Sequence, residues 1–323
     1  MTRPNLFKFH RTSPQLNIRT QEHSPLVVGV LGHALAKGAS AAVVAMLLIN
    51  PAAAATFTFS TGNPDGQIAT LSRTASPGKL ETETADDFIT TTSVSITSAT
   101  FTGLLVGGAT PANVNNVEIE LYHVFPSDSG LFDLRVNTRV NSPSDNNFAA
   151  ADASLGQLSF TTKVLSTSFT AANSVVNGIH AAPNQFTGGE GAVTGVEVQF
   201  NITFNTPIVL GPDHVFFRPE VDLGSAGDFL WLSAAKPIVA PGTPFTPDLQ
   251  SWIRNDGTGA LNPDWERIGT DVTHQGTFNA AFSLTGDIPD ASSTWSLLML
   301  VLMIMFGVRE LAMRSNSSGR ISP

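Results

Sequence analysis

Apolar and polar residues alternate along much of the chain between residues 56 and 287. Every second residue from Val196 to Phe204 is apolar, and the residues between them are polar. Because side chains two positions apart point to the same face of a β-strand, this alternation predicts a strand with one buried and one solvated face. Residues 117–121 follow the same pattern.

Shorter apolar stretches extend this pattern over the whole region. The stretches between them are rich in Gly, Pro, Asn, Asp and Ser, and no long amphipathic helical pattern is present. Many short strands joined by frequent turns are typical of an antiparallel β-sandwich, and we expect an all-β, jelly-roll-like ectodomain over residues 56–287. The further strand candidates are residues 94–96, 158–160, 214–217, 229–232 and 278–284.

The chain begins with a segment that has the features of an export signal. An apolar run at residues 38–49 follows a cationic stretch and leads into a series of alanines. Ala53 and Ala55 match the small-residue positions of a signal-peptidase site. We therefore expect residues 1–55 to be a signal peptide with an extended leader, and Thr56 to begin the mature chain. A buried, alanine-rich helix is the alternative.

The opposite end carries 18 residues without a formal charge, from Ala291 to Val308. As a helix this stretch would be about 27 Å long, close to the roughly 30 Å of a bilayer's hydrocarbon core. Arg309 and Arg314 follow it and would face the cytoplasm, which places the body outside. Because the stretch is apolar on all sides, we expect it to contact the membrane, with a buried core helix as the alternative.

The residues just before this stretch complete a larger pattern. Ile288-Pro289-Asp290, the apolar stretch and the basic residues together resemble the PEP-CTERM class of sorting signals. The resemblance is greatest to the variant whose signature is Val-Pro-Asp-Ser-Gly, with Ile288 in the place of Val. It implies that residues 288–323 are a sorting and anchoring segment that an exosortase recognises and cleaves near Pro289 and Asp290. It also implies delivery to the surface or extracellular matrix of a bacterium.

Parts of the body also resemble the ectodomains of several proteins of the same sorting class. The resembling stretches are residues 85–88, 229–233 and 278–286. This resemblance implies an architecture and a location outside the cytoplasm, and it brings no assigned chemistry with it.

Charge is distributed unevenly along the chain. The first 55 and the last 29 residues are net cationic, which leaves residues 56–294 with nine of the 17 basic and 24 of the 26 acidic residues, a net charge of −15. Nucleic-acid binding requires clustered Lys and Arg, so this anionic body argues against it. The chain has no Cys, which excludes thiolate metal sites and thiol nucleophiles.

The body contains no familiar catalytic motif. Neither the Gly-x-Ser-x-Gly elbow of serine hydrolases nor the His-Glu-x-x-His motif of zinc hydrolases is present. Glu118 and Glu120 could serve as the paired carboxylates of a glycoside hydrolase, but residues at this spacing also form the solvated face of a strand. We expect the solvated face, and therefore a protein that is not an enzyme.

Four acidic residues close together in sequence could bind a cation. Glu81, Glu83, Asp86 and Asp87 offer carboxylate oxygens, the ligands that Ca²⁺ prefers. The sequence predicts no cofactor other than a structural calcium ion at these residues. The alternative is a negatively charged sheet edge that discourages pairing between molecules.

Three tryptophans, Trp231, Trp252 and Trp265, lie in or near turn-rich sequence. Exposed aromatic faces can form a platform for sugars, but Trp is also a common core residue. Both possibilities stay open at this point: packing in the core, or ligand binding by a carbohydrate-binding module.

Two targeting signals without a catalytic motif between them predict an exported, non-catalytic surface or extracellular-matrix protein with a structural, biofilm or envelope role. Its partners would be signal peptidase, an exosortase-type enzyme, the membrane through the C-terminal helix, and extracellular polysaccharide. A carbohydrate-binding module is the alternative function, and a polysaccharide-active enzyme is a third.

Overall fold

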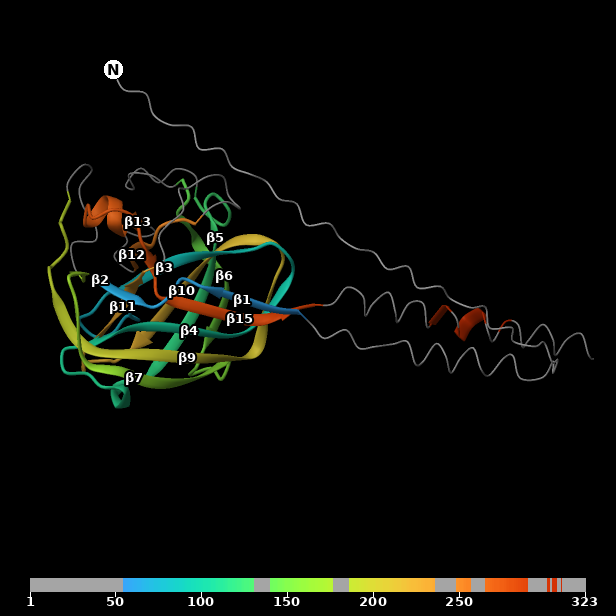
Figure 1. Cartoon of the computed structure of the whole chain (residues 1–323), viewed down its shortest axis with the longest axis horizontal. Helices are drawn as coiled ribbons and strands as arrows, with labels where there is room; N and C mark the ends of the chain where they lie inside the picture. Colours follow the sequence, from blue (N-terminus) through green and yellow to red (C-terminus); the bar gives the residue numbers. More distant parts are fainter. Residues whose placement is uncertain are drawn as a thin grey trace, which may run out of the picture. The chain divides into compact units, whose positions relative to one another are not determined.

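The computed structural model describes residues 55–130, 140–176, 186–235, 248–256 and 265–289, and a few helical residues between 301 and 309. The chain divides into two compact units after Asn50, and every described residue belongs to the second unit. This unit consists mainly of β-strands arranged in two sheets (Figure 1). The prediction of an all-β body is therefore confirmed.

The strands follow one another along the whole described body. They are β1 (Ala55–Ser60), β2 (Pro64–Leu71), β3 (Glu81–Thr90), β4 (Val94–Val106), β5 (Asn116–Val124), β6 (Pro143–Asp152), β7 (Leu158–Ala171), β8 (Asn173–Val175), β9 (Val193–Leu210), β10 (Asp213–Asp222), β11 (Asp228–Ala234), β12 (Trp252–Asp256), β13 (Glu266–Arg267), β14 (Asn279–Ala280) and β15 (Phe282–Ile288). Two single helical turns, η1 (Pro111–Asn113) and η2 (Ile268–Val272), lie between strands.

Nine strands form the first sheet, with β4 at its centre. One edge of β4 pairs with β9, and its other edge is shared by β15 and β11. The sheet continues from β9 to β7, from β15 to β1, and from β11 to β2 and β14. All of these pairs are antiparallel, whereas β2 and β8 pair in parallel.

Six strands form the second sheet, in the order β13-β12-β3-β10-β5-β6, and all of its pairs are antiparallel. Both β3 and β10 are interior strands, each with a neighbour on either side. Acidic residues on β3 therefore do not form a charged sheet edge, which corrects that alternative from the sequence.

The backbone pairing of β3 with β10 stops part of the way along the strands. Its last pair is Phe217 with Asp86. Pro219, two residues further along β10, has no N–H with which to continue the ladder. Ser72 bridges the two strands at this point. Its hydroxyl donates to the Pro219 carbonyl oxygen at 2.5 Å and accepts from the Thr84 N–H at 3.4 Å. Beyond this point, side chains rather than backbone groups connect the two strands.

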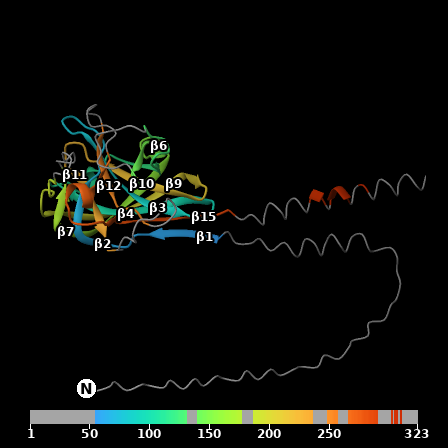
Figure 2. The same cartoon turned by 90° about the horizontal axis from the view of Figure 1, so that it is seen from above.

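The two sheets pack face to face around one main apolar core (Figure 2). Within the first sheet, the rings of Phe101 and Phe200 stack with centroids 4.8 Å apart. Between the sheets, Phe217 stacks on Phe282 at 5.1 Å. This shared core fits the predicted sandwich-like arrangement.

The predicted alternation is confirmed in β9, where Val198, Phe200, Ile202 and Phe204 are all buried. Residues 117–121 lie within β5 and alternate in the same way. The single strand expected at residues 278–284 is instead two strands, because β14 pairs with β11 and β15 pairs with β4.

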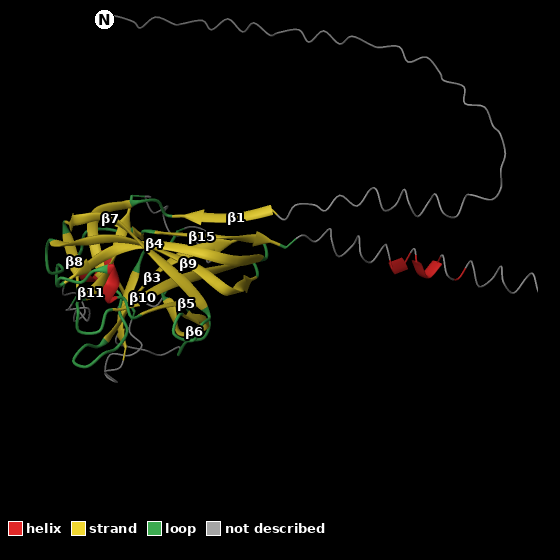
Figure 3. Ribbon diagram, turned by 90° about the horizontal axis from the view of Figure 1, so that it is seen from below, coloured by secondary structure: helices red, strands yellow, loops and turns green. Residues whose placement is uncertain are grey.

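The first and last strands of the described body are neighbours. β1 and β15 pair antiparallel along their full lengths, with Ala55 opposite Ile288 and Ser60 opposite Ser283 (Figure 3). The body therefore begins and ends at the same edge of one sheet. The residue pair at this junction is also where the predicted signal-peptidase site meets the predicted sorting element.

Several residues predicted for processing and sorting have a described position. Thr56 lies in β1, Pro289 is exposed just after β15, and Arg309 is an exposed helical residue. Ala53, Asp290 and Arg314 lie outside the described residues, as does most of the apolar stretch at 291–308. Among the residues that the structure describes, no helix is both long enough and apolar enough to cross a membrane.

Candidate functional site

A group of charged residues occupies the face of the second sheet that points away from the main core. It arises from the two-residue period of the strands: Arg218 and Glu220 on β10 share this face, and Val221 points to the core. Arg218 is paired in register with Glu120 of β5, and Arg254 of β12 with Glu83 of β3. We name this group the Arg218 cluster. Its members are Glu81, Glu83, Glu120, Tyr122, Arg218, Glu220 and Arg254.

Arg218 lies at the centre of the cluster and is almost completely buried. Its Nη2 atom donates to Oε1 of Glu83 and to Oε2 of Glu120, each at 2.6 Å. Its Nη1 atom lies 2.8 Å from Oε2 of Glu220, an ion pair without the alignment of a hydrogen bond. One guanidinium group thus contacts acidic residues from three strands.

Arg254 and Tyr122 support the same carboxylates. Arg254 donates from Nε to Oε2 of Glu83, and the Tyr122 hydroxyl lies 3.0 Å from Oε1 of that residue. The Arg254 guanidinium group also stacks over the Trp265 ring, 4.5 Å from its centroid. Both oxygens of Glu83 are therefore engaged by positive groups or by a neutral donor.

Burial controls the protonation of this cluster. Burial raises the pKa of Glu220 to about 8, although the positive charge of Arg218 opposes the shift. For Arg218, burial alone would lower the pKa, but Glu220, Tyr122 and the other nearby acidic groups raise it well above its usual value. Burial likewise raises the pKa of Tyr122, which keeps its hydroxyl neutral. Arg218 therefore stays charged, and burial favours the protonated form of Glu220.

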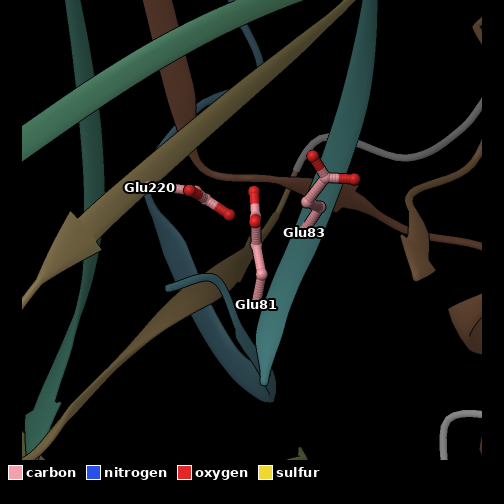
Figure 4. Close-up of side chains that lie close together, drawn as sticks. All are labelled: Glu81, Glu83 and Glu220. Carbon is pink, nitrogen blue, oxygen red and sulfur yellow. The ribbon is translucent and has the colours of Figure 1, made fainter. Parts of the chain in front are cut away.

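Three acidic residues of the cluster lie close enough to share one small ligand. Glu81, Glu83 and Glu220 each offer a carboxylate oxygen, and these oxygens lie within 4.8 Å of one another. Figure 4 shows Glu81 and Glu83 on β3, with the Glu220 carboxyl group turned toward Glu81. Within the described part of the chain, neither oxygen of Glu220 has a hydrogen-bond partner.

Access to the cluster is narrow. Glu83 and Glu220 are 1% and 0% exposed, whereas the side chain of Glu81 is 29% exposed. The Trp265 indole covers one side, held by a hydrogen bond from Nε1 to the Ser144 carbonyl oxygen at 3.0 Å. Among Glu81, Glu83 and Glu220, Glu81 is therefore the residue whose side chain contacts solvent.

The four residues predicted to bind calcium do not form one group. Glu81, Glu83 and Asp87 share the outer face of β3, but Asp86 points to the opposite face. Its carboxylate accepts from the Ser251 hydroxyl and from the Ala280 N–H, each at 2.9 Å. Burial raises the pKa of Asp86 well above its usual value, and the nearby charge of Asp87 adds to this. The strand period separates this residue from the other three.

Asp87 has a different partner on the outer face. Its Oδ2 lies 2.6 Å from Nε2 of His214, both side chains are 1% exposed, and its Oδ1 accepts from the Leu249 N–H at 2.9 Å. Burial raises the pKa of Asp87, although His214 opposes the shift. This pair joins β3 to β10 at the end where the backbone ladder is intact.

The predicted solvated face on β5 needs correction. Glu118 and Glu120 are only partly exposed, and the Trp265 ring packs against Tyr122, which lies on the same face of β5. Burial raises the pKa of Glu118, although the charge of Arg218 opposes the shift. These glutamates therefore belong to a covered polar layer rather than to an open strand face.

The three tryptophans lie in the core, so the described structure does not present them as a sugar-binding platform. Trp231, Trp252 and Trp265 are 0%, 1% and 2% exposed. Trp231 belongs to the main core, where its Nε1 donates to the Ala281 carbonyl oxygen at 2.9 Å. Trp252 and Trp265 belong to a second, smaller core on the outer face of the second sheet. Turn-rich flanks suggested exposure, but Trp231 and Trp252 lie within strands and all three rings are buried.

Sequence reasoning missed four members of the cluster: Tyr122, Arg218, Glu220 and Arg254. The two-residue period does place Arg218 and Glu220 on one face of a strand. That signal does not indicate whether the face is covered, nor which distant strands lie beside it. The strand register supplied this information.

Comparison with known proteins does not assign a function to the Arg218 cluster. No protein-family model matches the chain, and no curated protein matches it either.

Proposed function

We propose that the chain is an exported, non-catalytic bacterial protein of the cell surface or extracellular matrix, sorted through its C-terminal segment. The observation that carries the proposal is the pairing of Ala55 with Ile288, the first residue of β1 and the last residue of β15. Ala55 is the last residue of the predicted signal peptide, and Ile288 is the first residue of the predicted sorting element. Cleavage after Ala55 and near Pro289 would remove both flanking segments and would leave the two strands paired.

The use of the acidic residues supports a non-catalytic role. Glu83 and Glu120 are held in ion pairs with Arg218, and Glu220 is fully buried beside it. A glycoside hydrolase needs two carboxyl groups that a sugar can approach from opposite sides. The carboxylates of the Arg218 cluster instead connect strands through ion pairs, which is a structural role.

The finer parts of this proposal concern the ends and the topology. We propose a signal-peptide helix within residues 1–55 and a hydrophobic helix within residues 288–323 that anchors the chain to the membrane until an exosortase cleaves it. We also propose that the sandwich-like body has a jelly-roll-like topology. The supports are the sequence pattern of the two ends and the resemblance of residues 288–294 to the sorting class.

The test is mass spectrometry of the protein released from the surface of a bacterium that carries an exosortase. We expect an N-terminus at Thr56 or a close neighbour and a C-terminus near Pro289-Asp290. An Ala53→Asp variant should retain the signal segment, because a charged residue blocks the small-residue site. A released chain that still begins at Met1 and ends at Pro323 would contradict the proposal.

A further inference from the structure

The Arg218 cluster contains more acidic than basic groups. Four glutamates lie together with two arginines, so the fully ionised cluster carries a net charge of −2. Uncompensated charge in a buried site costs several kcal/mol or is neutralised. The cluster therefore requires positive charge beyond that of its two guanidinium groups, which a proton on Glu220 or a bound cation can supply.

Glu220 marks the place in the cluster where positive charge is lacking. Glu83 has Arg218 on one oxygen and Arg254 on the other. Glu120 is bound by Arg218 through Oε2 at 2.6 Å. Glu220 is 0% exposed and meets Arg218 only through Oε2, which leaves Oε1 without a partner among the described residues. Its carboxyl group points toward Glu81 (Figure 4).

The spacing of the three carboxylates fits a single ion. Oxygens that bind one Ca²⁺ at about 2.3–2.6 Å can lie at most about 5 Å apart. The offered oxygens of Glu81, Glu83 and Glu220 lie within 4.8 Å of one another. Because the ligands are all oxygens, the site suits a hard cation rather than a soft one.

We propose that Glu81, Glu83 and Glu220 bind a hard divalent cation of the Ca²⁺ class. Two positive charges offset the excess of two negative charges in the cluster. The ion joins β3 to β10 where their backbone ladder has ended, and it reaches the site along the partly exposed side chain of Glu81. Compared with the calcium ligands predicted from the sequence, this set contains Glu220 and lacks Asp86 and Asp87. The proposal does not depend on export, because it rests only on the body of the protein.

The test is thermal unfolding of the full chain, freed of metal with a chelator and then titrated with CaCl₂. Extracellular Ca²⁺ modules have dissociation constants of about 10⁻⁴–10⁻³ M, so the titration should reach about 5 mM. We expect Tm to rise by about 4 °C over this range, and above the dissociation constant the rise should follow the logarithm of the Ca²⁺ concentration. Isothermal titration of the same sample with CaCl₂ should show one ion bound per chain. NaCl at equal ionic strength should not reproduce the rise, which separates binding from screening of the anionic body.

Matched variants test whether the rise in Tm comes from Ca²⁺ binding at these three glutamates. Glu220→Gln keeps the side-chain shape and removes a ligand charge, and it should weaken Ca²⁺ binding about tenfold or more. Glu81→Gln should do the same at a partly exposed position, where folding tolerates substitution. Glu197→Gln changes a buried glutamate of β9 outside the cluster and should keep the full rise in Tm. The proposal is overturned if CaCl₂ does not raise the Tm of wild type above the NaCl control, or if Glu81→Gln and Glu220→Gln retain the full rise.

Discussion

Arg218 donates from Nη2 to Oε1 of Glu83 at 2.6 Å, joining β10 to β3 where the backbones of these two strands no longer pair. Both side chains are at most 2% exposed. Pro219 interrupts the ladder beside this contact, and Ser72 fills the space in the plane of the sheet. A buried ion pair therefore connects two interior strands at a position where a β-sheet would normally use hydrogen bonds of the main chain.

Replacement of Arg218 should destabilise the fold strongly. In Arg218→Met, Glu120 and Glu220 lose the guanidinium group that pairs with them, and Glu83 keeps only Arg254. Removing one partner of a buried ion pair costs about 3–5 kcal/mol. We expect the free energy of unfolding, measured by urea denaturation, to fall by about this amount.

A more exposed ion pair provides the control. Arg73 pairs with Asp228 at 2.8 Å, with side chains 16% and 23% exposed, and its replacement by Met should cost about 1 kcal/mol. Arg218→Lys should recover only part of the loss, because a single ammonium group cannot reproduce the planar fork. Equal losses for Arg218→Met and Arg73→Met would contradict a central role for the cluster.

Asp228 should make stability depend on pH in the acid range. Burial alone would raise its pKa, but hydrogen bonds and charges from Lys79 and Arg73 lower it below the usual value. A carboxylate with a lowered pKa in the folded state stabilises the fold above the unfolded pKa of about 3.9. This contribution is lost as the pH falls through the folded-state pKa.

The measurement compares wild type with Asp228→Asn by urea denaturation across the acid range. The wild type should be more stable by about 1 kcal/mol from pH 7 to about pH 5. The difference should shrink once the pH falls below about 4. Asp287→Asn, at an exposed position, should show no such change. A difference that grows with acidity would have the wrong sign and would rule out this ion pair as the cause.

The burial of the tryptophans predicts their fluorescence. Trp231, Trp252 and Trp265 should emit at short wavelength in the folded protein and should resist quenching by iodide. The fourth tryptophan, Trp295, should first be replaced by Phe so that only these three contribute. Strong quenching before unfolding would mean that the rings are exposed, and it would restore the sugar-binding platform.

Removal of β1 should weaken the body, whereas removal of the segment before it should not. Phe57 and Phe59 of β1 pack against the main core, and each half-buried ring contributes about 1.5 kcal/mol. A chain that begins at Thr61 should therefore lose about 3 kcal/mol relative to one that begins at Ala55. Thermal unfolding of the two chains measures the difference. Equal Tm values would show that β1 is dispensable.

The sequence alone predicts the strands well where one face of the strand meets the core. In β9 the alternation reports burial directly, because Val198, Phe200 and Ile202 face the other sheet. The turn-rich flanks of Trp231 suggest that its ring is exposed, whereas residues 229–232 form a continuous apolar run. Such a run is typical of a strand that is buried on both sides. Read in that way, it would have placed Trp231 in the core.

The Arg218 cluster could not be predicted in the same way. Its members come from four strands, and Glu83 and Arg254 are separated by 171 positions in the chain. The two-residue period of a strand assigns each residue to one face of the sheet. Strand order and register decide which residues of different strands lie side by side. Charged residues at this spacing usually indicate a solvated face, but here the Trp265 ring packs against Tyr122 and Arg254.

The pairing of β1 with β15 also determines how the body responds to mechanical load. A pull on the chain beyond Ile288 acts along β15, which is bonded to β1 on one side and to β4 on the other. Antiparallel hydrogen bonds lie perpendicular to the strands. Such a pull therefore loads two rows of bonds together in shear and does not open them one at a time. The strand that leads to the predicted sorting segment is therefore held on both sides against force from that direction.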